Sequence, residues 1–203
     1  MRRFVIVGRK ATASPDFLLD DLAGTSGRLD VLLRCLRAAI LVSHGLRRDV
    51  VVYLVMLGGE RAPRTLRLEG AAARFIRPDE RALAMLVKKA LARDADGGGF
   101  VRVRDGIFLA DGGIDAVLAD VGAGTPYILE EGAPDLRTLE LDAHSPIVFV
   151  GGHTGFDDDT RSKLAAIAAT PISIGPVSIH ADDAVAIVSN ELDRRLATVG
   201  RPA

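Results

Sequence analysis

Three glycine-bearing segments in the second half of the chain are the residues best suited to bind a small ligand. Each follows a short apolar run: Glu130-Glu-Gly132 follows Pro126–Leu129, Gly151-Gly-His-Thr-Gly155 follows Pro146–Val150, and Gly175-Pro176 follows Ile172–Ile174. Glycine lets the backbone turn sharply, and backbone N–H groups exposed at such turns bind polar or anionic groups. Because the spacing fits neither G-x-G-x-x-G nor G-x-x-x-x-G-K-[ST], it does not favour a dinucleotide or P-loop site.

Short strands and a long helix must position these segments. In a parallel sheet, all three segments leave at the carboxyl edge, where open α/β sheets bind ligands. Further strands are predicted at Phe4–Gly8, Val50–Leu57 (central in the sheet), Pro63–Glu69 and Ile107–Ala110. Helices are predicted from Arg28 to about His44, from Pro78 as first helical residue, at Gly113–Val121, from the Asp157–Thr160 cap to Ala169, and from Asp182 to about Thr198. The remaining signals are weaker: Asp16–Leu22 as a helical turn, Asp94–Gly99 as a flexible loop, and Asp135–Leu141 as a strand or irregular segment.

Composition limits the class of protein. A chain of 203 residues that is 48% hydrophobic predicts one domain with a substantial core. No apolar run is long enough to cross a bilayer, and Arg9-Lys10 interrupts the only N-terminal stretch that resembles a signal sequence, so we expect a cytoplasmic protein. The single cysteine, Cys35, excludes an internal disulfide, and four histidines without paired spacing predict no metal site. The aspartates at 157–159 are interpreted as a helix cap rather than metal ligands.

Charge is segregated along the chain although the formal net charge is −1. Residues 28–81 contain eleven Arg against six acidic residues, whereas residues 105–160 contain one Arg against twelve acidic residues. A codon bias toward arginine explains the choice of Arg over Lys but not this segregation, which indicates an anionic partner for the first region. Within it, Arg34 and Arg37 are interpreted as a solvated helix face. Arg47 and Arg48 beside Asp49 fit either a phosphate site oriented by the carboxylate or a surface ion pair.

Taken in order, five motifs resemble a known family. They are Gly24-Thr-Ser-Gly-Arg-Leu-Asp-Val-Leu32, Ser43-His-Gly-Leu-Arg-Arg-Asp-Val50, Pro78-Asp-Glu-Arg81, Gly151-Gly-His-Thr-Gly155 and Ser173-Ile-Gly-Pro-Val-Ser-Ile-His-Ala-Asp182. Together they are similar to the archaeal tRNA (pseudouridine(54)-N(1))-methyltransferases, members of the SPOUT superfamily. The resemblance implies an α/β fold with a mostly parallel sheet, helices on both faces and a C-terminal deep trefoil knot. It also implies one domain over 1–203, with an RNA-facing half at about 1–93 and a knotted half at about 100–203.

The resemblance implies that the three glycine-bearing segments bind S-adenosylmethionine (SAM). The implied cofactor residues are Leu129, Gly151, Gly152, Ile174, Gly175, Pro176, Val177, Ser178, Ile179 and Ala184. Two of them depart from the family pattern, which often has Asp at Gly152 and Cys at Ala184. Cys35 receives no catalytic role.

The resemblance further implies N1-methylation of pseudouridine 54 in tRNA. Arg28, Arg47, Arg48 and Arg81 are then expected to hold RNA phosphate or the flipped base, and Asp30 or Asp49 to fix those arginines or accept the N1 proton. A structural salt bridge explains each aspartate equally well, and capping explains His153 and His180. We expect a homodimer built on the last helix. A ribosomal RNA substrate, or a non-catalytic RNA- or SAM-binding dimer, stays open.

Overall fold

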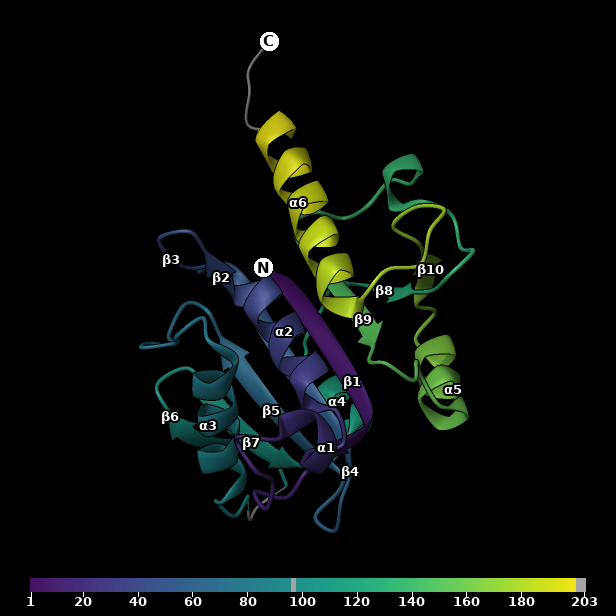
Figure 1. The fold of residues 1–203 in the computed structure, drawn as a ribbon. Coiled ribbons are helices and arrows are strands. Elements are labelled where there is room, and N and C mark those ends of the chain that lie inside the picture. The colour runs from purple at the N-terminus through teal and green to yellow at the C-terminus, as the bar shows by residue number, and fades with distance from the viewer. Residues whose placement is uncertain (96–97, 200–203) are drawn as a thin grey trace.

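One eight-stranded sheet forms the centre of the computed structural model, which describes residues 1–95 and 98–199 (Figure 1). Its order is β10-β8-β9-β1-β4-β5-β7-β6. The parallel strands are β10 (Thr170–Ile172), β8 (Thr125–Leu129), β9 (Pro146–Gly151), β1 (Arg2–Thr12) and β4 (Val50–Gly58). The antiparallel continuation is β5 (Arg64–Glu69), β7 (Ile107–Asp111) and β6 (Val101–Arg104). The mostly parallel sheet and the central place of β4 are confirmed.

Helices cover both faces of the sheet, as predicted. Side chains alternate along β1, so Phe4 and Ile6 belong to the buried cluster that also contains residues of α2 (Leu29–Ile40), α3 (Glu80–Leu91) and α6 (Ala181–Val199). Val5 and Val7 face the opposite side, where α4 (Ile114–Asp120) and α5 (Asp158–Ala166) lie. The two buried clusters therefore hold the strands that end at the glycine-bearing segments.

The helix predicted to reach His44 ends earlier, at Ile40. Leu41–Val42 (β2) and Gly45–Leu46 (β3) form a small antiparallel hairpin instead. Gly45 adopts φ 156°, which a residue with a side chain rarely adopts, so the turn chemistry of 43–45 overrides the helical pattern.

The start of α3 also differs from the prediction. Pro78 is not the first helical residue, because the carboxylate of Asp79 accepts a hydrogen bond from the Ala82 N–H at 2.8 Å and makes Asp79 the N-cap. The Asp157 cap was predicted correctly: its side chain accepts from the Thr160 N–H at 2.8 Å. The helical turn predicted at Asp16–Leu22 does not form there, and the four-residue helix α1 (Leu22–Thr25) begins at the last residue of this segment instead.

Two further differences concern the second half. The strand predicted at Ile172–Ile174 ends at Ile172, because the Ser173 backbone bonds to Pro134 and Leu136 rather than to β8. Of the two options for Asp135–Leu141, the irregular one holds, with a 3-10 turn at Leu136–Thr138 (η1). Strand β6 was not predicted. The expected loop at Asp94–Gly99 includes residues 96–97, which lie outside the described part of the chain.

Within residues 1–95 and 98–199, no helix has the length and apolar character needed to cross a bilayer. The same residues contain no group of three His, Cys, Asp or Glu side chains placed to hold a metal ion. Threading of the chain into a knot stays a prediction.

Candidate active site

A cavity of about 1050 Å³ lies at the carboxyl edge of β8, β9 and β10. Its walls come from the three glycine-bearing segments and from the first turns of α2 and α6. The predicted convergence of these segments is confirmed, since all ten residues proposed for the cofactor line this cavity: Leu129, Gly151, Gly152, Ile174, Gly175, Pro176, Val177, Ser178, Ile179 and Ala184.

The segment from Ile174 to His180 supplies backbone donors. In the described structure none of its N–H groups donates a hydrogen bond to another protein group. Gly175 adopts φ 138°, which favours glycine, and the Ser178 hydroxyl donates to Glu131 at 2.5 Å. Val177 and Ile179 are large apolar side chains left exposed. This wall can therefore hold a ligand that has both an apolar body and hydrogen-bond acceptors.

The segment after β9 is a tight glycine turn. The Gly152 N–H donates to the Val7 carbonyl at 2.8 Å, and the Gly155 N–H donates to the Gly152 carbonyl at 2.9 Å. A Cβ at Gly151 would lie 2.9 Å from the Gly155 Cα, and one at Gly152 would lie 3.1 Å from the Val7 oxygen. The turn thus presents its backbone to the cavity. A side chain at Gly151 would collide with the backbone of Gly155, and one at Gly152 would press on the backbone of Val7.

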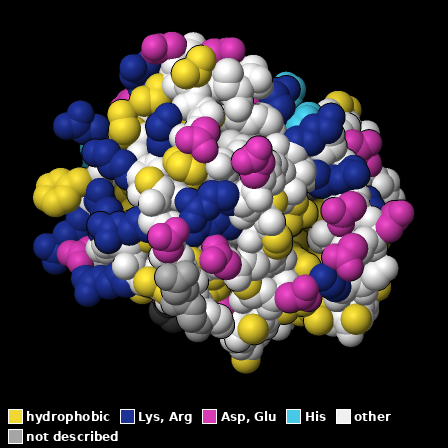
Figure 2. Space-filling view, turned by 90° about the horizontal axis from the view of Figure 1, so that it is seen from below, with side chains coloured by type: hydrophobic (Ala, Val, Ile, Leu, Met, Phe, Trp, Pro, Cys, Tyr) yellow, Lys and Arg dark blue, Asp and Glu magenta, His cyan; other side chains and the backbone are white. Residues whose placement is uncertain are grey.

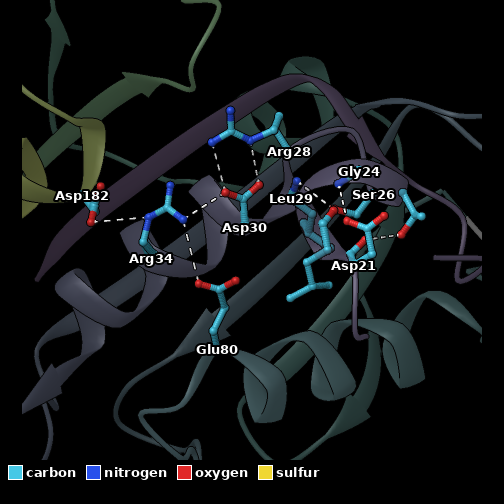
Figure 3. A network of polar contacts seen from close by, with 11 residues as sticks. Asp21, Gly24, Ser26, Arg28, Leu29, Asp30, Arg34, Glu80 and Asp182 are labelled. Atoms are coloured by element: carbon cyan, nitrogen blue, oxygen red, sulfur yellow. Dashed lines mark hydrogen bonds and ion pairs between the residues drawn. The ribbon is translucent and has the colours of Figure 1, made fainter. Parts of the chain in front are cut away.

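A network of ion pairs borders the cavity on the side of α2 (Figure 3). Arg28 donates to both carboxylate oxygens of Asp30, at 3.0 and 3.1 Å, and Arg34 donates to Asp30 Oδ2 at 2.9 Å. Arg34 also lies 3.7 Å from Asp182 and 3.8 Å from Glu80. The network connects α2 with α3 and with the first turn of α6, so Arg28 is held firmly beside the cavity.

The electrostatics of this network follow from its geometry. Burial alone would raise the pKa of Asp30, but the hydrogen bonds and charges of Arg28 and Arg34 outweigh it and lower that pKa below its ordinary value. Asp30 therefore stays ionised at neutral pH. The exposed His153 on the rim has a pKa below the ordinary histidine value, because of slight desolvation and the positive charges of Arg28 and Lys10, and this favours the neutral imidazole.

Arg34 and Asp182 were not predicted as site residues. The interpretation of Arg34 and Arg37 as a solvated helix face is wrong for Arg34, which lines the cavity, whereas Arg37 is exposed. The i,i+4 spacing of Asp30 and Arg34 was the signal available in the sequence. The partner across helices, Asp182, had no local signal.

Other predicted RNA and catalytic residues lie away from the cavity of their own chain. Asp49 precedes β4 at its amino end, roughly 20 Å along the strands from Gly151. Its carboxylate does not orient Arg47 and Arg48 as predicted. It accepts from Arg2 instead, Arg47 pairs with Asp193 at 2.6 Å, and Arg48 donates to backbone carbonyls. At the start of α3, Arg81 forms an exposed ion pair with Asp20.

Cys35 is buried in the core beside α6, and burial raises the pKa of its thiol. A thiol in this state is not a nucleophile at neutral pH.

A family model and individual relatives both place this chain in one family. A family described as "Putative SAM-dependent RNA methyltransferase" matches residues 1–197. A tRNA (pseudouridine(54)-N(1))-methyltransferase of Methanosarcina mazei is 38% identical over 98% of this chain and 94% of its own length. One from Halobacterium salinarum is 40% identical over 95% of this chain and 96% of its own length.

The fold has a solved counterpart. The crystal structure of Archaeoglobus fulgidus Nep1 bound to S-adenosylhomocysteine aligns with a TM-score of 0.67 at 17% identity, covering 97% of this chain and 99% of that one. At this identity the likeness concerns the fold alone. With near-complete coverage by close relatives, the chain belongs to the tRNA (pseudouridine(54)-N(1))-methyltransferase family of SAM-dependent RNA methyltransferases.

Proposed function

We propose that this protein transfers the methyl group of SAM to N1 of pseudouridine 54 in tRNA. The observation that carries the proposal is the near-full-length identity to relatives of that name. The cavity at the carboxyl edge supports it, because its size, its apolar side chains and its free backbone donors suit a nucleoside with an amino-acid tail. A tRNA substrate also supports a cytoplasmic location.

The cofactor supplies an electrophilic methyl group when bound. The ten residues named above hold it mainly through backbone, with Gly175 and the Gly151–Gly155 turn letting the main chain approach closely. Most of the rate then comes from orienting the nucleophilic nitrogen against the methyl group.

Arg28 binds RNA at the cavity in this proposal. Both oxygens of Asp30 already accept from arginines, so its role is to fix Arg28 rather than to accept a proton. Arg47, Arg48 and Arg81 contact RNA phosphates farther from the reacting base. The base itself must leave its stack to reach the cavity.

A homodimer through α6 supplies the remaining groups. The exposed stripe of this helix carries Asp183 near one end, Arg194 near the other, and Ala186 and Asn190 between them. Neither charged side chain has an ion-pair partner in the described structure. Antiparallel packing of two α6 helices around a two-fold axis pairs Asp183 of each copy with Arg194 of the other, and the small residues allow close approach.

This packing completes the site. Arg2 binds both Asp49 and Asp193, so Asp49 lies beside the C-terminal half of α6. The antiparallel arrangement brings the C-terminal half of α6 and the adjoining Asp49 of one copy to the cavity of the other copy. Asp49 Oδ1, which accepts no hydrogen bond among the described residues, then receives the N1 proton as the methyl group arrives. The N1–carbon bond would form as the sulfur–methyl bond breaks, and the Asp49 carboxylate would take up the proton released from N1.

The substrate is tested with labelled SAM and three RNAs. Two are matched tRNAs with pseudouridine or uridine at position 54, and the third is a ribosomal RNA fragment that contains a pseudouridine. Methyl incorporation only into the first tRNA supports the proposal. Incorporation only into the ribosomal fragment would replace it with the rRNA activity, and SAM binding without incorporation into any RNA would leave a non-catalytic binder.

A further inference from the structure

A second cavity of about 1400 Å³ lies at the other end of α2 from the first. Its walls are the β2–β3 hairpin, the segment 71–78 that follows β5, and the turn between β6 and β7. Of the residues that line it, only Arg48 has a part in the proposed function, as a distant contact to RNA phosphate, and the cofactor does not use this groove.

Phe75 is the most exposed large hydrophobic side chain that lines it. The side chain is 90% exposed, so it contributes almost nothing to the core. Its backbone has φ 57°, a left-handed conformation that is unfavourable for a residue with a bulky side chain. Folding gains nothing from an aromatic ring at this position. The ring is instead presented to solvent next to a cavity, where it is available to a ligand.

Arginines surround this ring. Arg48, Arg74 and Arg102 line the groove with one acidic residue, Asp105, which pairs with Arg102. Arg48 is held by the carbonyls of Gly70 at 3.0 Å and Ala71 at 3.3 Å, and carbonyls leave its positive charge unneutralised. Figure 2 shows Lys and Arg side chains gathered around a projecting hydrophobic group on the side of the molecule that carries β2, β3 and β6 in Figure 1.

The arginines of this groove differ from other arginines of the first region in how far acidic side chains neutralise them. Two arginines of the basic first region are neutralised by the acidic second region, since Arg64 pairs with Asp111 and Arg67 with Asp120. In the described structure, by contrast, the exposed Arg74 side chain has no acidic partner. The segregation seen in the sequence therefore persists at the groove rather than over the whole first half.

We propose that the groove is a second RNA-binding site, in which Phe75 stacks on an unpaired base and Arg48 and Arg74 hold the neighbouring phosphates. This proposal rests on RNA being the substrate. An exposed aromatic ring among arginines is the combination that binds single-stranded or loop nucleotides, because every base has a face for stacking. The groove and the first cavity lie toward opposite ends of α2, whose 12 residues span about 18 Å, so one folded RNA reaches both.

The test compares tRNA binding by the wild type, Phe75→Ala, Phe75→Trp and a matched control, Ile167→Ala. Ile167 is also a partly exposed hydrophobic residue but lines neither cavity. We expect Phe75→Ala to weaken tRNA binding and raise the KM for tRNA by about tenfold, with kcat and the Kd for SAM unchanged. Phe75→Trp retains wild-type binding, and so does Ile167→Ala. In a salt titration, Arg74→Ala reduces the slope of log K against log salt by about 0.7–0.9, the value for one lost phosphate contact.

Wild-type tRNA binding by Phe75→Ala, or equal losses in the alanine and tryptophan variants, would overturn the inference. The test separates this inference from the proposed reaction. If the wild type methylates tRNA and Phe75→Ala has an unchanged KM, only the groove is rejected. If the wild type binds tRNA without methylating it and Phe75→Ala loses binding, the groove stands and the reaction is rejected.

Discussion

Arg28 and Asp30 form a bidentate ion pair across the first turn of α2, with Nε–Oδ1 and Nη2–Oδ2 distances of 3.0 and 3.1 Å. Arg28 occupies the N-cap position with φ 69°, a conformation that is costly for any residue except glycine. The pair compensates for that strain and directs the guanidinium toward the cavity. Of the non-glycine residues with positive φ in the described structure, Arg28, Phe75 and Ala168, only Arg28 lines this cavity.

Asp30→Asn is expected to reduce stability and RNA recognition together. The amide cannot accept as strongly from Arg28 and Arg34, so unfolding free energy falls by about 1–3 kcal/mol. Arg28 loses its fixed position, so the KM for tRNA rises while the Kd for SAM changes little. Urea unfolding and SAM titration measure the two effects. Unchanged stability and unchanged KM would mean that Asp30 does not hold Arg28.

The same pair predicts a particular dependence of stability on pH. Because the pKa of Asp30 is lowered in the folded protein, its contribution is fully present above the ordinary aspartate pKa of about 3.9 and is lost as pH falls through the folded value. The difference in unfolding free energy between wild type and Asp30→Asn should therefore be constant from about pH 5 to 8 and shrink only below about pH 4. A difference that changes across neutral pH would show that another group titrates.

Gly175→Ala is expected to weaken SAM binding through the backbone alone. A Cβ there meets no atom within 4 Å, but φ 138° is unfavourable for alanine. Relaxation of that strain shifts the segment that supplies the backbone donors, and about 1 kcal/mol corresponds to roughly a fivefold higher Kd. Gly122→Ala is the matched control, because Gly122 has φ 72° and equal space but lies outside the cavity. Its Kd for SAM should stay at the wild-type value, and an equal rise in both variants would contradict the assignment.

Charge reversal tests the proposed dimer. Arg194→Asp places like charges opposite Asp183 of the other copy, so mass measurement in solution should show monomers, and methylation should fall with dimer content. The double variant Asp183→Arg with Arg194→Asp restores the attraction and the dimer. A wild-type protein that is monomeric, or a double variant that stays monomeric, would exclude the antiparallel α6 interface.

Local patterns predicted most of the scaffold and the location of the cavity. Apolar runs followed by glycine identified β8, β9 and the segment after β10, and parallel pairing alone brings their carboxyl ends together. What the sequence did not predict depends on contacts between distant elements. Asp49 directly follows two arginines in the chain but bonds to Arg2, 47 residues away. Arg34 meets Asp182 only because α2 and α6 pack side by side. Such pairs leave no periodic signal.

The boundaries that were wrong have local causes. The end of α2 at Ile40 depends on Gly45 forming a turn, and the start of α3 depends on the Asp79 side chain. In both places a single side chain or turn outweighs helix propensity, which is a weak preference per residue. The exposed ring of Phe75 gave no signal either, since exposure is a property of the folded chain.

Identification of the methylated nucleoside tests the central claim most directly. Transfer RNA with pseudouridine at position 54 is incubated with the protein and SAM, digested to nucleosides and analysed by mass spectrometry against synthetic standards. The account predicts N1-methylpseudouridine as the product, derived from the T-loop fragment and absent when position 54 is uridine. Methyl transfer to N3, to a ribose oxygen or to another position in the tRNA would contradict it.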